Sequence, residues 1–305
     1  MLQSMVARTV MRAAIRTFVS KLKPETRRRI KNAWQYLLLA LLALQAVGPF
    51  LWLLSTALKG PGENIFAYPP QFIPAHPTLE NFVSVWHKVP MPWFFINSIV
   101  VTLLTIFFNI TLSVLAAYPL ARMRFKGQNT IFFSILATMM IPFQVLMIPL
   151  YLICLKLNLT DGGGLINGWM GLVLPFAVSG FGIFFVRQAL VTLPRELEES
   201  AVLDGCNSWQ ILWHILLPLI RPTLATLAVF AFMATWGEFL WPSIILSDPH
   251  HFTLPVGLVQ LQSAFSADWK LIAAGTLLSM VPMLVFFFAL QRYFVSGATA
   301  GAVKG

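Results

Sequence analysis

Charged residues are scarce in this sequence. Only 10% of its 305 residues are Asp, Glu, Lys or Arg, whereas 58% are hydrophobic. A soluble domain carries roughly 25% charged residues, and the mean hydropathy here is +0.76. This composition argues against an ordinary water-soluble protein. It indicates an all-α membrane protein that crosses a lipid bilayer several times.

Motifs of nucleotide binding and catalysis are absent from the sequence. No G-x-x-x-x-G-K-[ST] segment is present, so we expect no ATP site of the P-loop type. G-x-S-x-G, H-E-x-x-H and C-x-x-C segments are absent as well. We therefore expect neither enzyme activity nor a bound cofactor in this chain.

Disulfide and metal-site patterns are also absent. The two cysteines are Cys154, in an apolar run, and Cys206, in a polar segment, and they fit neither kind of site. His250 and His251 are neighbours in a loop, where adjacent side chains point in different directions. We interpret both histidines as exposed loop residues and not as metal ligands.

Six apolar windows are long enough to cross a bilayer, which requires about 20 residues of helix. They cover residues 33–57, 94–120, 130–155, 168–190, 219–247 and 268–291. Prolines within these windows kink helices and free backbone carbonyls; they are Pro142, Pro149, Pro175, Pro242 and Pro282. The sequence thus predicts six transmembrane helices, which either bend around a path or pack irregularly.

The distribution of basic residues predicts the orientation of these helices. Six spans place both termini on one side, and 17 of the 21 Lys and Arg residues lie on that side. Because cytoplasmic segments carry the excess of positive charge, we predict that both termini are cytoplasmic. No basic stripe with interleaved aromatic residues is present, so we expect no nucleic-acid partner.

Residues 1–32 form a basic arm before the first span. Residues 5–22 contain no acid, and Arg8, Arg12 and Arg16 would form one stripe of an amphipathic helix. Three interpretations remain open for this arm. It resembles a transit peptide, a helix that lies on an anionic membrane surface, or a cytosolic arm of little function.

One long polar segment, residues 194–218, interrupts the later spans on the predicted cytoplasmic side. Three of its acids fall in the first turns of a predicted helix over residues 194–205, where carboxylates complement the positive helix end. Pro194 suits the first turn of this helix and Gly205 suits its end. Ser208 is the expected cap of a second helix that continues into the next span.

The spacing within this segment resembles the EAA motif of permease subunits in binding-protein-dependent ABC importers. That motif reads E-A-A, three residues, G, nine residues and I-x-L-P. The matching residues have the same spacing, and they are Glu199, Ser200, Ala201, Gly205, Ile215, Leu216, Leu217 and Pro218. The departure is Ser200, a small residue in place of the usual alanine.

Two further stretches resemble the carbohydrate-uptake branch of this family, including its maltose-type permease subunit. Residues 236–242 read W-G-E-F-L-W-P and resemble a W-N-E-F-L segment, with Gly237 in place of the usual asparagine. The ending from Gln291 to Gly305 resembles the C-terminus of that branch. The resemblance begins at about the first span and leaves out the basic arm.

The resemblance implies the six-helix permease fold of type I ABC importers over residues 33–291, followed by a cytosolic tail over residues 292–305. It also implies that residues 194–205 form a coupling helix, which docks on a cytosolic ATPase. The residues implied in this contact are Glu198, Glu199, Ser200, Ala201, Asp204 and Gly205.

The resemblance implies a set of partners as well. They are a second permease subunit, two copies of a cytosolic ABC ATPase, and an extracytoplasmic solute-binding protein. ATP and Mg would be bound by the ATPase, and this chain would hold no cofactor. The implied location is the inner (plasma) membrane of a bacterium, crossed several times.

Glu238 is the only acid inside a predicted span. A charged side chain there costs about 2.5–3.5 kcal/mol on insertion scales, so the carboxylate must face protein or water. In one interpretation Glu238 lines a translocation path, in which Trp236 and Trp241 stack on a sugar ring. In the other it makes a structural hydrogen bond to a neighbouring helix or to a partner subunit.

Two other functions fit parts of the sequence. An ABC permease for a non-sugar solute would carry the same motif. A self-sufficient secondary transporter would need buried ionisable pairs, and only Glu238 is available. We therefore expect a subunit of an ATP-driven importer for a sugar or a sugar-like solute, such as a di- or oligosaccharide, a polyol or a glycosylated compatible solute.

Overall fold

The structure is a computed structural model that describes residues 24–262 and 268–300. Every regular element in these residues is a helix, which confirms the all-α fold class. A helix suits a lipid environment because it satisfies its backbone polar groups within one segment. The elements are α2 (Pro24–Leu58), α3 (Glu80–Lys88), α4 (Met91–Arg122), α5 (Gln128–Thr138), α6 (Phe143–Lys156), η1 (Asp161–Gly163), α7 (Leu165–Val173), η2 (Leu174–Phe176), α8 (Gly180–Thr192), α9 (Glu196–Leu203), α10 (Ser208–Gln210), η3 (Ile211–Leu216), α11 (Leu217–Leu219), α12 (Arg221–Trp236), α13 (Leu240–Ile245), η4 (Pro249–His251), α14 (Leu254–Val259) and α15 (Trp269–Ala300).

Four helical stretches of the described residues are long and apolar enough to cross a membrane by themselves. They are Asn32–Leu58, Met91–Arg122, Phe143–Gly163 and Trp269–Gln291. Two bent pairs bring the number to six if each pair is one span. Leu165–Phe176 meets Gly180–Thr192 at 54°, and Ser208–Leu219 meets Arg221–Trp236 at 77°. The predicted six spans therefore have counterparts, but not all of them are straight.

Breaks divide three of the predicted windows. The window over residues 130–155 divides into α5 and α6, because Pro142 adopts an extended conformation with φ −59° and ψ 135°. Pro175 lies in η2, where the window over residues 168–190 bends. The window over residues 219–247 is interrupted between α12 and α13. Pro149 and Pro282 instead remain inside the helices α6 and α15.

The predicted terminal segments lie partly outside the described residues. Residues 1–23 of the basic arm are among those that the structure does not describe, and the rest of the arm belongs to α2. Helix α15 continues to Ala300, so most of the predicted tail extends the last helix. Residues 301–305 are again outside the description.

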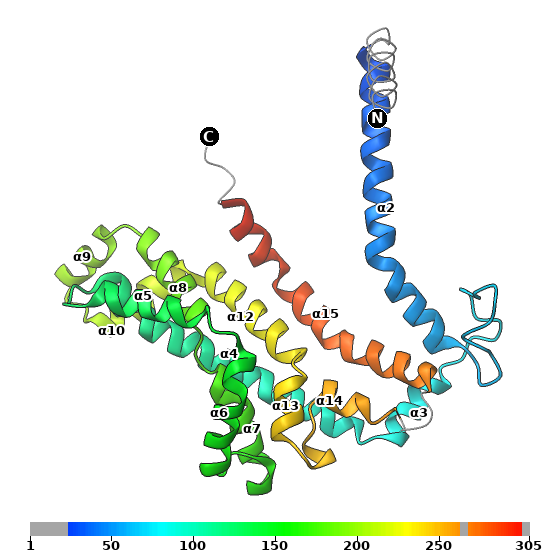
Figure 1. The fold of residues 1–305 in the computed structure, drawn as a ribbon. Coiled ribbons are helices and arrows are strands. Elements are labelled where there is room, and N and C mark those ends of the chain that lie inside the picture. Colours follow the sequence, from blue (N-terminus) through cyan, green and yellow to red (C-terminus); the bar gives the residue numbers. More distant parts are fainter. Residues whose placement is uncertain (1–23, 263–267, 301–305) are drawn as a thin grey trace, which may run out of the picture.

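Helix α4 is the central element of the fold. It runs diagonally through the molecule and packs against α7, α8 and α12 (Figure 1). Its exposed face is apolar and includes Leu103 and Phe107. Its buried face carries polar residues three or four positions apart, which places them along one side of the helix; they are Ser98, Thr102, Thr105, Asn109 and Ser113. This stripe faces protein because polar groups at membrane depth need partners or water.

Helices α4 and α8 approach each other closely at Gly182. A Cβ atom at this position would collide with Ser113 Oγ and would lie 2.9 Å from Ser179 Oγ. Ser179 caps α8, because its Oγ accepts a hydrogen bond from Gly182 N at 3.0 Å. Asn109 Nδ2 donates to the same Oγ at 3.2 Å and to Phe176 O at 3.0 Å. The crossing thus requires a glycine and is held by polar contacts.

Helix α2 stands apart from the rest of the bundle. It meets α15 near α3 and diverges from there, whereas α15 packs against α12 (Figure 1). None of the most apolar 18 residues of α2 is buried within this chain. This helix therefore presents its side chains to lipid or to another chain.

The proline-rich loop between α2 and α3 is ordered by one carboxylate. Glu63 accepts backbone hydrogen bonds from Gly60, Ala75 and His76 at 3.0–3.2 Å. The hydrogen bond from His76 is the main reason that the pKa of Glu63 lies below its usual value, and those from Ala75 and Gly60 add to it. Lys270 Nζ donates to Gly60 O at 2.6 Å and fixes the loop to α15. The loop thus has a definite anchor on α15.

Candidate coupling site and central cavity

The predicted helix over residues 194–205 corresponds to α9, which covers Glu196–Leu203. Gly205 follows it with φ +83°, a left-handed conformation that glycine adopts readily. Gly205 N donates to Val202 O at 3.0 Å and Cys206 N donates to Ala201 O at 2.9 Å. These two bonds form a Schellman motif, which satisfies the last carbonyls of the helix. The predicted role of Gly205 as the helix stop is therefore seen in the backbone.

The second helix begins one residue earlier than the sequence suggested. Asn207, and not Ser208, is the cap: its Oδ1 accepts from Gln210 N at 2.9 Å, and Gln210 Oε1 accepts from Asn207 N at 2.8 Å. This reciprocal pair is a capping box, which satisfies two otherwise free backbone donors. Asn207 is as good a cap as serine, so the sequence alone did not distinguish the two positions.

The second helix is not continuous with the next span, contrary to prediction. It passes through the π-helix η3 and then turns by 77° before α12. Pro218 and Pro222 donate no backbone hydrogen bond, and each leaves a carbonyl one turn earlier without its helical partner. Ile220, between them, adopts φ −98° and ψ 13°, outside the helical range. The structure therefore has a bend where the sequence predicted one continuous helix.

The six residues implied in coupling fall into two groups. Glu199, Ser200, Asp204 and Gly205 are exposed. Ala201 is buried and packs with Ile211 and Leu212 in the core formed by α4, α8 and η3. Glu198 also turns inward. Leu203, which the sequence did not single out, is 88% exposed at the end of α9.

Glu198 pairs with Arg122, the last residue of α4. Arg122 Nε lies 2.7 Å from Glu198 Oε1, and the two side chains are only 5% and 18% exposed. Arg122 Nη2 also donates to Leu193 O at 3.0 Å, in the link between α8 and α9. In the sequence Arg122 contributed only to the count of cytoplasmic charges, because nothing in its spacing identifies a partner 76 residues away.

A cavity of about 620 Å³ lies between α4, α8, α12 and α13. Its walls are largely apolar and include Phe176, Phe181 and Trp241. Polar side chains that line it are Thr105, Asn109, Ser179, Thr235, Glu238 and Thr253. Within the described residues, three buried polar atoms of this lining have no hydrogen-bond partner; they are Thr105 Oγ1, Asn109 Oδ1 and Thr253 Oγ1.

Glu238 lies in the break between α12 and α13. Its Oε1 accepts a hydrogen bond from Trp241 N at 3.1 Å, near the start of α13. The carboxylate is therefore held by a backbone donor while its residue lines the cavity. Glu238 thus has a place on the cavity wall, and its hydrogen bond is local, to the residue three positions further on, and not to a neighbouring helix.

The two tryptophans near Glu238 face different surroundings. Trp241 is fully buried, lines the cavity, and donates from Nε1 to Gly171 O at 3.0 Å. Trp236 does not line this cavity: its ring stacks on Phe232 and its Nε1 donates to Ser279 O of α15 at 2.9 Å. The structure brings Glu238 and Trp241 together and places Trp236 against α15.

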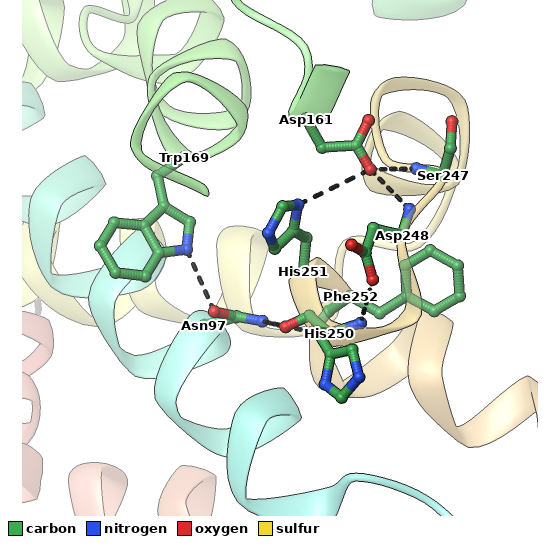
Figure 2. Close-up of polar contacts among 8 residues, drawn as sticks. All are labelled: Asn97, Asp161, Trp169, Ser247, Asp248, His250, His251 and Phe252. Carbon is green, nitrogen blue, oxygen red and sulfur yellow. Dashed lines mark hydrogen bonds and ion pairs between the residues drawn. The ribbon is translucent and has the colours of Figure 1, made fainter. Parts of the chain in front are cut away.

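A polar network holds the loop that carries the two histidines (Figure 2). Asp161 Oδ2 accepts from Asp248 N at 2.6 Å and lies 3.9 Å from His251 Nδ1. Asn97 Nδ2 donates to His250 O at 2.8 Å, and Trp169 Nε1 donates to Asn97 Oδ1 at 3.2 Å. His250 is exposed as expected, but His251 is half-buried against Asp161. The described residues contain no group of three or more side chains that could hold a metal ion.

Comparison with known proteins places these features in one family. The family model described as "Binding-protein-dependent transport system inner membrane component" matches residues 109–299. The chain is 35% identical to the arabinooligosaccharides transport system permease protein AraQ of Halalkalibacterium halodurans, over 87% of this chain and 94% of that protein. It is 34% identical to the lactose transport system permease protein LacG of Rhizobium radiobacter, over 91% of this chain and 98% of that protein.

A solved structure shows the same fold. It is a chain from the crystal structure of a bacterial ABC transporter involved in the import of the acidic polysaccharide alginate. The TM-score is 0.77 at 24% identity, and the match covers 87% of this chain and 97% of that one. The chain therefore belongs to the family of binding-protein-dependent transport system inner membrane components, as the multi-pass permease of an ABC importer and not as its ATPase.

Proposed function

We propose that this chain is a permease subunit of an ATP-driven importer for oligosaccharides or related sugar-like solutes. The relatives named above transport arabinooligosaccharides and lactose, and the structural neighbour imports a polysaccharide. A second permease subunit completes the translocation path. Two copies of a cytosolic ATPase bind ATP and Mg, and an extracytoplasmic binding protein delivers the solute.

The observation that carries this proposal is the construction of α9. It is a short helix with a defined end at Gly205, and it lies between the two bent helix pairs, of which one ends at Thr192 and the other begins at Ser208. Glu199, Ser200 and Asp204 present polar groups on its outer surface. This exposed face docks on the ATPase, while Ala201 and Glu198 anchor the helix to the bundle.

The cavity is the proposed path of the solute. A sugar offers both hydroxyl groups and apolar ring faces, so a site for it combines apolar walls with a few well-placed polar groups. Here Trp241 and the phenylalanines form the walls, and Glu238, Thr105 and Asn109 supply polar groups. A solute hydroxyl would satisfy the buried atoms of Thr105 and Asn109 that lack a protein partner. Trp236 serves packing against α15.

The proposed orientation follows from the charge distribution. Both termini and α9 face the cytoplasm. The loop that contains Glu63 and the loop that contains His250 face outward. The exposed surface of α2 is covered by lipid and by the second permease subunit. Closure of the ATPase dimer moves α9, and the movement opens the cavity to the outside.

Transport by the reconstituted complex tests this function. The chain is purified with its partner permease and ATPase, placed in proteoliposomes, and supplied with the binding protein and a labelled oligosaccharide. We expect uptake that requires ATP and stops when ATP hydrolysis is blocked. Uptake that persists on an ion gradient without ATP would identify a secondary transporter. ATP-driven uptake of an amino acid or another non-sugar solute in its place would refute the substrate class.

A further inference from the structure

The cytoplasmic end of α4 is joined to α9 by a buried ion pair. Arg122 Nε lies 2.7 Å from Glu198 Oε1, and Arg122 Nη2 donates to Leu193 O at 3.0 Å. One guanidinium thus contacts the end of α4, the link that follows α8, and α9 itself. A buried arginine is destabilising unless its charge is paired, so these contacts also fix its position.

Neighbouring side chains hold the end of α4 in place. Arg187 Nε of α8 donates to Leu120 O at 2.9 Å, and Gln128 Nε2 donates to the same oxygen at 2.8 Å. The Arg187 guanidinium also lies 4.0 Å from the centre of the Phe132 ring. The last turn of α4 is therefore a fixed attachment point, to which Arg122 ties the coupling helix.

Helix α4 is also a wall of the central cavity. Thr105 and Asn109 line the cavity and belong to the same helix that ends at Arg122. The covalent route from α9 to the cavity is different. It passes through the π-helix η3 and the 77° bend before α12. The ion pair instead joins α9 to the end of α4 directly, with no bend in between.

We propose that Arg122 is a positioning residue for transport. Its ion pair with Glu198 passes the displacement of α9 to α4 and thereby to the cavity wall. This inference rests on the proposed coupling role of α9, and it adds the contact through which α9 moves the rest of the bundle. It also gives Glu198 a role different from that of Glu199: Glu198 holds the bundle, and Glu199 faces the ATPase.

The first test separates coupling from assembly. Arg122→Gln and Glu198→Gln each remove the ion pair, and Arg124→Gln, an exposed arginine two residues further on, is the matched control. Each variant complex is reconstituted, and the solute taken up per ATP hydrolysed is measured together with the amount of ATPase that co-purifies. We expect about a tenfold lower uptake per ATP for the two ion-pair variants, a typical coupling effect for residues in one charged network. ATPase recovery and the control should stay at wild-type values.

The second test replaces the ion pair by a covalent link. The native cysteines Cys154 and Cys206 are changed to serine, and Arg122→Cys and Glu198→Cys are introduced together. Bifunctional thiol reagents of increasing length join the two cysteines, and a reductant releases them. We expect the unlinked protein to be uncoupled, the linked protein to regain uptake per ATP, and reduction to reverse the gain. A role in folding alone would not respond reversibly to the linker.

The outcomes of these tests distinguish failure of this inference from failure of the proposed transport function. If the wild-type complex shows no ATP-driven uptake, the proposed function fails and the inference fails with it. If the wild type transports but the unlinked double cysteine variant retains full uptake per ATP, only the inference is overturned. Loss of ATPase binding in Arg122→Gln, or no recovery with a linker of any length, would also overturn it.

Discussion

The conformation of Gly205 permits a graded prediction about the end of α9. Its φ is +83°, and a Cβ atom added there would meet nothing within 4 Å. A substitution at Gly205 therefore changes backbone strain without creating a clash. The left-handed conformation costs an ordinary L-residue about 1–2 kcal/mol, and asparagine less. Proline at this position requires a φ near −65° and also removes the hydrogen bond from Gly205 N to Val202 O, so it costs about 3 kcal/mol or more.

These energies predict an order of variants. Gly205→Asn should transport nearly as well as the wild type, Gly205→Ala should be weaker, and Gly205→Pro should be uncoupled while it still inserts in the membrane. A cost of 1–2 kcal/mol changes the population of an intact turn by about 5- to 30-fold. ATP-driven uptake and ATPase co-purification are measured for each variant.

Gly127 provides a matched control for the Gly205 series. It also has a positive φ, +86°, and open space at the Cβ position, but it lies between α4 and α5 and outside the coupling site. Gly127→Ala should have a similar backbone strain and a smaller effect on uptake. Equal transport by Gly205→Asn and Gly205→Pro would show that the turn at Gly205 does not limit coupling.

Three further predictions concern other parts of the molecule. Gly182→Ala should overpack the crossing of α4 and α8 at a cost of about 1–3 kcal/mol, so the melting temperature should fall. Adding Ser113→Ala should restore part of the melting temperature. An unchanged melting temperature in Gly182→Ala would contradict the close approach of the two helices. Glu238→Gln should insert normally and change the apparent solute affinity in uptake assays; an unchanged affinity would assign Glu238 to packing alone. The pKa of the Glu63 carboxylate is lowered in the fold, so its contribution to the stability of the loop is present above its ordinary pKa of 4.5 and is lost as the pH falls through the folded pKa. The protection of the Ala75 and His76 amides from hydrogen exchange should therefore fall in that acidic range. In Glu63→Ala both amides should be unprotected at every pH.

The sequence predicted those features that depend on local composition. Apolar length identified the spans, because a bilayer sets the length of a helix that crosses it. A helix commonly ends at a residue in the left-handed conformation, which glycine adopts readily, and this preference identified Gly205 as the end of α9. The spacing of Glu199, Gly205 and Pro218 identified the family, which the comparisons confirm.

Features that depend on tertiary contacts were not predictable in the same way. Arg122 and Glu198 are separated by 76 positions in the sequence, and no local pattern pairs them. Trp236 and Trp241 are near one another in the sequence, yet a break between α12 and α13 directs them to different surroundings. The bend at Ile220 lies between two prolines, but no local pattern in the sequence gives its angle of 77°.

In the proposed function, the exposed face of α9 receives the movement of the ATPase. The most direct measurement uses Glu199→Lys, which reverses the charge of an exposed residue without touching the Arg122 contact. Membrane insertion, co-purification of the ATPase and ATP-driven uptake are measured on the same preparation. We expect normal insertion, with ATPase recovery and uptake both strongly reduced. Wild-type ATPase recovery together with full uptake would show that this face does not contact the ATPase.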